Sequence, residues 1–94
     1  MITCNVTGFL TEFTGGDHQV VLPCPARTVG EALQQLWQLH SALRDRVLNE
    51  RGEVRQHVNI FIDNENIRHK AALETPVNGD VEITILPAVS GGSI

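Results

Sequence analysis

The stretch that decides the fold runs from residue 28 to residue 47 and reads TVGEALQQLWQLHSALRDRV. Thr28 precedes Glu31 by three residues, the spacing of a capping box, in which each side chain binds the free backbone N–H of the other residue. At 100° per residue one face of the helix collects Val29, Leu33, Leu36, His40, Leu43 and Val47. The pattern predicts a helix that begins at Val29 and packs one face on a sheet, with Ser41 as a point where a short second helix can start.

Two strands are expected before this helix. Residues 2–7 alternate polar and apolar side chains and are rich in β-branched residues, which is typical of a half-buried strand. The glycines within residues 14–17 permit a turn, because glycine adopts positive φ values, and residues 19–22 return as a second strand. The N-terminal segment is therefore predicted to form a hairpin.

Two further strands are expected after the helix. Residues 57–63 alternate cleanly and end at a predicted turn at residues 64–66. Residues 81–86 alternate in the same way after the turn signal at residues 78–80. One main helix can cover only one face of the resulting sheet, so this order of elements predicts an α+β domain and not a doubly wound sheet.

The expected topology is a β-grasp fold. Helical connections normally carry crossovers between parallel strands, and such crossovers are right-handed. We expect a mixed sheet of four or five strands with one main helix packed on one face. The domain is predicted to span residues 1–86, and residues 87–94 are predicted to form a flexible C-terminal tail, because they have no periodicity.

Composition restricts the classes of partner. The 94 residues suffice for one domain, and 11 acidic against 7 basic residues give a net charge of -4, the wrong sign for binding nucleic acid. The sequence has no apolar window long enough to span a membrane and no pattern of a secretory signal, so we expect a cytoplasmic chain without membrane contact. Two cysteines in such a chain are expected to be free thiols, Cys4 and Cys24.

The polar residues form no pattern typical of a catalytic centre. The four histidines lack both the i, i+4 spacing and the cysteine partners of a zinc site, so no bound metal is expected. Gly15-Gly16 is followed by neither the lysine nor the helix of a phosphate loop, so this pair is interpreted as a turn. Carboxylate pairs such as Glu50 and Glu53 lie in polar stretches typical of solvated surface. We therefore expect that the chain is not itself an enzyme.

The C-terminal segment PAVSGGSI, residues 87–94, has a different character. Six extended residues from Pro87 to Gly92 reach about 20 Å beyond the sheet, which is enough to enter the active site of another protein. Gly91 and Gly92 have no side chains to obstruct a narrow channel. The alternative is a frayed terminus, which is the usual reason for glycines near a chain end.

Residues 57–68, HVNIFIDNENIR, and residues 79–92, GDVEITILPAVSGG, resemble the MoaD/ThiS family of ubiquitin-like sulfur carriers. In that family the last strand continues into Leu-Pro, then small or apolar residues, then Gly-Gly. The matching positions here are Leu86, Pro87, Ala88, Val89, Gly91 and Gly92. The resemblance covers most of the chain, is weakest in the first 30 residues, and is greatest to the carrier that supplies sulfur for cysteine synthesis.

The resemblance implies a carrier that partner enzymes act upon. An ATP-dependent enzyme of the ubiquitin-activating type would adenylate the carboxylate of Gly92, and a sulfur donor would then displace AMP to leave a thiocarboxylate. The sulfur would pass to a biosynthetic enzyme, for example one similar to cysteine synthase. The tail would lie in a partner's channel through Pro87, Ala88, Val89, Ser90 and Gly91. The carrier itself would bind no cofactor and would be a monomer.

The sequence departs from the simplest members of this family at its end, because Ser93 and Ile94 follow Gly92. The carboxylate of Ile94 is not the one that would be activated. We therefore expect a precursor from which a peptidase removes both residues by hydrolysing the Gly92–Ser93 bond. Some family members are processed in this way by JAMM-type zinc metalloproteases.

A carrier also needs a docking surface on the sheet face away from the helix. By strand parity, Phe61 and Leu86 point to that face and are the candidate docking residues. The alternative is that a loop or strand edge covers Phe61, because aromatic side chains are frequently buried.

Three other functions remain open at this point. The chain can be a ubiquitin-like modifier attached to lysines through Gly92, or the small subunit of a molybdopterin synthase. It can also be a β-grasp binding module whose tail has no role. Only the last alternative predicts full function after deletion of Gly91 and Gly92.

Overall fold

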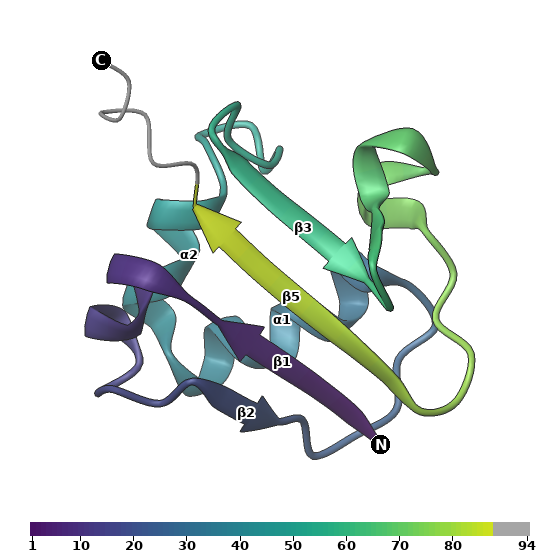
Figure 1. Cartoon of the computed structure of the whole chain (residues 1–94), viewed down its shortest axis with the longest axis horizontal. Helices are drawn as coiled ribbons and strands as arrows, with labels where there is room; N and C mark the ends of the chain where they lie inside the picture. Colours follow the sequence, from purple (N-terminus) through teal and green to yellow (C-terminus); the bar gives the residue numbers. More distant parts are fainter. Residues whose placement is uncertain (88–94) are drawn as a thin grey trace.

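The structure is a computed structural model that describes residues 1–87. Its elements follow the chain as β1 (Ile2–Val6), η1 (Gly8–Phe13), β2 (Gln19–Val21), α1 (Val29–Leu39), α2 (Ser41–Val47), β3 (Val58–Ile62), β4 (Glu65–Asn66), η2 (Ile67–His69), η3 (Ala72–Glu74) and β5 (Val81–Pro87). The five strands form one mixed sheet in the order β2-β1-β5-β3-β4 (Figure 1). This arrangement confirms the predicted β-grasp fold.

The central strand of the sheet is β5. It runs parallel to β1, with Cys4 opposite Ile83, and antiparallel to β3, with Ile60 opposite Ile85. Helices α1 and α2 lie behind the sheet in Figure 1 and cover one face, which leaves the other face open. The break between α1 and α2 confirms that a second helix starts at Ser41.

The core lies between the sheet and the helices. Strands β1 and β3 alternate buried and half-buried residues along their length, as a sheet with one covered face requires. The largest side chains that are less than 2% exposed include Leu10, Leu33, Leu36, Leu43, Ile60, Ile67, Ile83 and Ile85. None of the helices in residues 1–87 has the length and hydropathy needed to cross a membrane.

The start of α1 is capped on one side as predicted. The Glu31 backbone N–H donates to Thr28 Oγ1 at 3.1 Å. The reciprocal bond is different from the prediction, because Glu31 Oε1 accepts from the backbone N–H of Arg27, at 3.0 Å. The residues before the helix are held extended by pairing with residues 75–77, and this brings the Arg27 N–H to the carboxylate.

The turn after β3 lies one residue earlier than predicted. Asp63 and Asn64 have positive φ angles of 46° and 77°, and Ile62 pairs with Glu65, which describes a two-residue hairpin of the I′ class. Asn and Asp tolerate such φ values better than other residues with side chains. Glu65 and Asn66 therefore belong to the edge strand β4 and not to the turn.

The connection between β1 and β2 contains the 3₁₀ helix η1, which the sequence pattern did not predict. Its one buried residue, Leu10, enters the core. Of the two cysteines, Cys4 is buried in β1 and Cys24 is exposed, and both are free thiols.

Candidate functional site

Strand β5 is the last described element before the predicted C-terminal tail. Its last residue, Pro87, which the sequence pattern assigned to the tail, is buried and lies opposite Val58 of β3, so the structure includes it in the sheet. Proline has no N–H to donate, and the pairing of β5 with β1 has already ended at Ile85. The predicted tail positions Ala88, Val89, Ser90, Gly91 and Gly92, and the extension at residues 93–94, lie outside the described residues.

The segment that follows β1 holds the end of β5. Thr7 donates to the carbonyl oxygen of Ile85 from both its backbone N–H, at 3.3 Å, and its hydroxyl, at 2.9 Å. Gly8 has a φ of +61°, and a Cβ atom at this position would lie 3.1 Å from Pro87 Cγ. The last described residue of the chain is thus packed closely against the start of η1.

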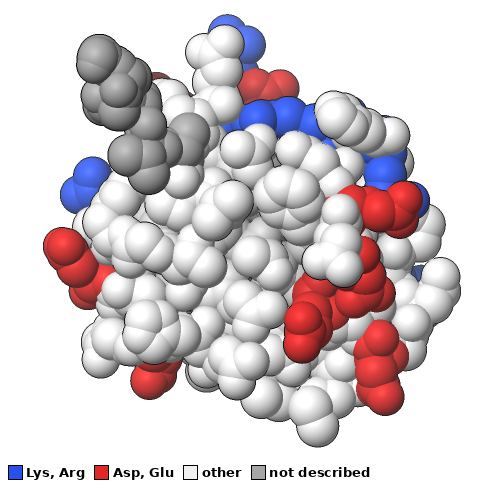
Figure 2. All heavy atoms as spheres, viewed as in Figure 1, with Lys and Arg blue, Asp and Glu red and all other residues white. Residues whose placement is uncertain are grey.

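The uncovered face of the sheet includes both predicted docking residues. Leu86 is 42% exposed and Phe61 is half-buried. Phe61 lies opposite Thr84, two residues before Leu86, so the two apolar side chains are diagonal neighbours on adjacent strands. Figure 2 shows that the centre of this face carries no charged side chains. Their position on the outer face agrees with the strand parity, and their role in docking stays a prediction.

Phe61 is only partly exposed because the edge strand lies beside it. Asn66 of β4 is the pairing partner of Phe61, and the Asn66 amide donates to Asn59 Oδ1 at 3.3 Å. Arg68 also donates to this oxygen, at 3.0 Å. The alternative that a loop or strand edge covers Phe61 is therefore correct in part, because the edge strand β4 lies beside this side chain and leaves it half-buried.

A groove lies directly beside the end of β5. It has a volume of about 260 Å³ and is lined by Phe9, Asp45, Arg46, Arg55, His57, Val58 and Pro87. We call it the tail-root groove, because it is lined by Pro87, the last described residue before the predicted tail. Sequence analysis did not find it, since its residues come from η1, α2, the loop before β3, and the sheet, and no local motif joins these segments.

Arginines are held in fixed positions around this groove. The guanidinium of Arg46 lies over the ring of Phe13, 4.8 Å from its centroid. Arg55 Nε donates to the backbone oxygen of Asp45 at 3.0 Å, and Arg68 Nη2 donates to the backbone oxygen of Arg55 at 2.6 Å. These contacts link the arginines to three separate segments. In Figure 2, Lys and Arg side chains gather along the upper edge of the face, while Asp and Glu side chains gather at the right.

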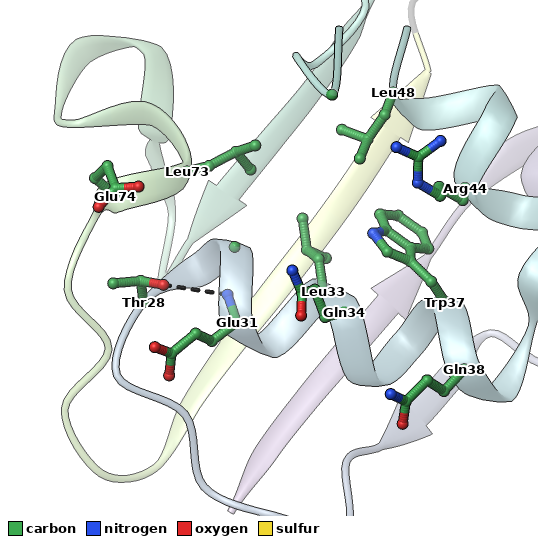
Figure 3. Close-up of a pocket in the computed structure, with 12 residues that line it drawn as sticks. Thr28, Glu31, Leu33, Gln34, Trp37, Gln38, Arg44, Leu48, Leu73 and Glu74 are labelled. Carbon is green, nitrogen blue, oxygen red and sulfur yellow. Dashed lines mark hydrogen bonds between the residues drawn. The ribbon is translucent and has the colours of Figure 1, made fainter. Parts of the chain in front are cut away.

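A second, larger cavity lies on the helical side of the molecule (Figure 3). Its volume is about 620 Å³, and residues of α1, α2 and η3 line it together with parts of the adjoining loops. Three of its lining side chains, Leu33, Trp37 and Leu48, are core residues, which confirms the predicted core or boundary position of Trp37. The remaining lining residues include no cysteine or histidine.

The buried thiol is not a candidate nucleophile. Burial raises the pKa of Cys4 to about 12, so the thiol stays protonated and unreactive near neutral pH. Within residues 1–87, no three or more His, Cys, Asp or Glu side chains are grouped so that they can hold a metal ion.

Comparison with known proteins identifies the family. The ThiS family model matches residues 4–92. The sulfur carrier protein CysO of Mycobacterium tuberculosis is 29% identical over 93 residues, covering 97% of this chain and 98% of the relative. Small archaeal modifier protein 1 of Haloferax volcanii is 42% identical over 66 residues, covering 69% of this chain and 70% of the relative.

Solved structures agree with this result. A chain in the crystal structure of the Amycolatopsis orientalis BexX/CysO complex superposes with a TM-score of 0.88 at 28% identity, covering 98% of this chain and all of that one (100%). The crystal structure of Mycobacterium tuberculosis CysO superposes with a TM-score of 0.85 at 27% identity, covering 95% and 100% of the two chains. The protein therefore belongs to the ThiS family, among ubiquitin-like sulfur carriers and modifiers.

Proposed function

We propose that this protein carries sulfur as a thiocarboxylate on Gly92 for the biosynthesis of cysteine or another sulfur-containing metabolite. The observation that most supports the proposal is the extent of the family match, which runs to Gly92 and leaves out Ser93 and Ile94. The similarity to CysO over nearly the whole of both chains favours cysteine as the product. Because the cycle uses ATP, we place it in the cytoplasm.

The cycle begins with hydrolysis of the Gly92–Ser93 bond by a JAMM-type zinc metalloprotease, which leaves Gly92 with a free carboxylate. This carboxylate is a poor electrophile until its oxygen is converted into a leaving group. An activating enzyme of the ubiquitin-activating type transfers AMP from ATP to the carboxylate and releases pyrophosphate. Sulfide then displaces AMP and leaves the thiocarboxylate directly. When the donor is a persulfide, its terminal sulfur displaces AMP to form an acyl disulfide, and a second thiol cleaves the S–S bond to release the thiocarboxylate and a disulfide.

The product is a thiocarboxylate, an anionic and soft nucleophile at neutral pH. Its sulfur attacks an activated substrate on an acceptor enzyme, for example one similar to cysteine synthase. Hydrolysis of the adduct leaves the sulfur on the substrate and restores the Gly92 carboxylate. In this cycle the chain supplies a carrier atom and a docking domain, and its partners supply the catalysis.

The geometry at the end of β5 supports this role. Pro87 is buried, pairs with Val58 of β3 and packs against Gly8, so the last described residue before the predicted tail is held in the sheet. Phe61 and Leu86 lie on the open face of the sheet close to this point, and the uncharged centre of that face fits an apolar partner surface (Figure 2).

Intact-mass spectrometry of the protein from its native cells tests the proposal. We expect a chain that lacks Ser93 and Ile94 and a second form in which one oxygen at Gly92 is replaced by sulfur. Replacing the gene in these cells with versions that encode shortened chains provides matched variants. A chain ending in Gly92 should function without the peptidase, whereas a chain ending in Ser90 should not function. Full activity of the shorter chain would refute the proposal and favour a plain binding module.

The similarity to small archaeal modifier protein 1 supports a second candidate, a modifier attached to lysines through Gly92. Self-attachment would use the N-terminal amine or Lys70, the one lysine in the sequence, whose ammonium lies 3.2 Å from Glu65 Oε1. Isopeptide adducts of Gly92 on other proteins, found by peptide mass spectrometry, would identify this activity. A third alternative, the small subunit of a molybdopterin synthase, would copurify with a larger catalytic subunit.

A further inference from the structure

The tail itself has little with which to select a partner. Residues 87–92 have no charged side chain, and only the carboxylate of a processed Gly92 adds a charge. That charge is negative, as is the whole chain at -4. Approach to an enzyme that holds the phosphates of ATP is therefore opposed by like charge. An attractive contact near the tail is needed to offset this repulsion.

The tail-root groove has the charge to provide that contact. Arg46 and Arg55 form its basic rim, and no carboxylate within residues 1–87 forms an ion pair with either. Asp45 also lines the groove, but its Oδ1 atom lies 3.3 Å from Nη1 of the neighbouring Arg44. The side chains of Arg46 and Arg55 need little further ordering on binding, because Arg46 is stacked on Phe13 and Arg55 is hydrogen-bonded to a backbone oxygen.

The groove also has an apolar part. Phe9 is 56% exposed, which is unusual for a large aromatic side chain, and it shares the groove with Val58 and Pro87. The volume of about 260 Å³ suits one large apolar side chain surrounded by polar contacts. A basic rim around a small apolar hollow is complementary to a segment that has acidic residues on either side of an apolar anchor.

We propose that the tail-root groove binds an acidic segment of the activating enzyme, carrying one apolar anchor residue, at the mouth of the channel that receives the tail. This inference rests on the proposed function. Among the partners, the activating enzyme brings the Gly92 carboxylate closest to ATP, so it is the partner for which the offsetting attraction matters most. Because Pro87 lines the groove, a segment bound there lies beside the point where the tail departs.

The test measures adenylation of the chain ending in Gly92 by its activating enzyme, as ATP–pyrophosphate exchange. We expect Arg46→Glu to raise the KM for the carrier about tenfold while kcat stays within about twofold, since reversing a docking charge acts on encounter and binding. Added salt should reduce the difference in KM between Arg46→Glu and the wild type, because it screens the docking charges. Phe9→Ala should raise KM severalfold without this dependence on salt.

Arg27→Glu is the matched control, because it makes the same change in charge at the opposite end of the sheet. The carbonyl oxygen of Arg27 accepts from Val77 N–H, beside the loop that leads into β5. Urea unfolding of each variant separates loss of docking from loss of folding.

The possible outcomes distinguish failure of the proposed carrier function from failure of the docking role assigned to the groove. If the wild-type chain ending in Gly92 is not adenylated at all, the proposed function fails. If it is adenylated and Arg46→Glu matches Arg27→Glu in KM, only the assignment of the groove is overturned. The assignment is also overturned if Arg46→Glu slows hydrolysis of the Gly92–Ser93 bond but leaves adenylation unchanged.

Discussion

Replacing Gly8 with alanine should destabilise the protein through a contact with the base of the tail. A residue with a side chain at the observed φ of +61° costs about 1 kcal/mol relative to glycine. The added Cβ would also lie 3.1 Å from Pro87 Cγ, closer than an ordinary van der Waals contact. Overpacking of this kind typically costs at least about 1 kcal/mol. The expected total is about 2 kcal/mol.

Gly15→Ala provides the matched control. Gly15 has a similar φ of +68°, but no atom lies within 4 Å of the position that its Cβ would occupy. Both variants change the entropy of the unfolded chain equally, so the difference between them isolates the contact with Pro87. Urea unfolding followed by the fluorescence of Trp37, which is 9% exposed, measures both. With a slope of about 1 kcal/mol per M, the midpoint of Gly8→Ala should lie about 1 M below that of Gly15→Ala.

A double-mutant cycle completes the test. In the background of Pro87→Ala the ring atom is absent, so Gly8→Ala should cost no more than Gly15→Ala does. The reasoning is refuted if Gly8→Ala and Gly15→Ala have the same free energy of unfolding to within about 0.3 kcal/mol, the scatter expected for independent sites. It is also refuted if Pro87→Ala leaves the cost of Gly8→Ala unchanged.

Four further predictions concern titration, thiol reactivity and helix capping. Because burial raises the pKa of Cys4 to about 12, the folded state should lose stability as pH rises from about 9 to 12, and Cys4→Ala should remove this loss in alkaline urea titrations. An alkylating agent at mildly alkaline pH should label Cys24 and leave Cys4 unlabelled, as peptide mass spectrometry would show. The hydrogen bond and charge of the N-terminal amine lower the pKa of Asp80. Acetylation of that amine should therefore raise the pKa of Asp80 measured by NMR. An unchanged pKa would contradict the pairing of Asp80 with the amine. Thr28→Ala removes the cap of α1 and should cost about 1 kcal/mol, whereas Thr28→Ser should retain most of the stability.

The sequence predicted those parts of the fold that depend on periodicity. The alternation in residues 57–63 and 81–86 and the helical pattern from Val29 are signals within single elements, and their order restricts the topology to few choices. Gly91-Gly92 is also a local motif and was equally visible, and its role stays a prediction. Each of these predictions needed only neighbouring residues.

Other parts needed contacts between distant residues. The 3₁₀ helix η1 has no repeat long enough to give a periodic pattern, and it is fixed by burial of Leu10. Pro87 looked like the start of a tail because proline usually ends strands, but pairing with Val58 includes it in the sheet. The tail-root groove joins side chains from residue 9 to residue 87, so it exists only once the sheet is assembled.

The position of β5 in the middle of the sheet also affects how the protein is made. The strands on either side of it, β1 and β3, have no hydrogen-bonded contact with each other and are joined only through β5. A ribosome synthesises β5 after every other described strand, so the nascent chain cannot close its sheet until residue 87 has left the exit tunnel. Chains interrupted during translation would therefore lack both the native sheet and Gly92, and would be open to proteolysis.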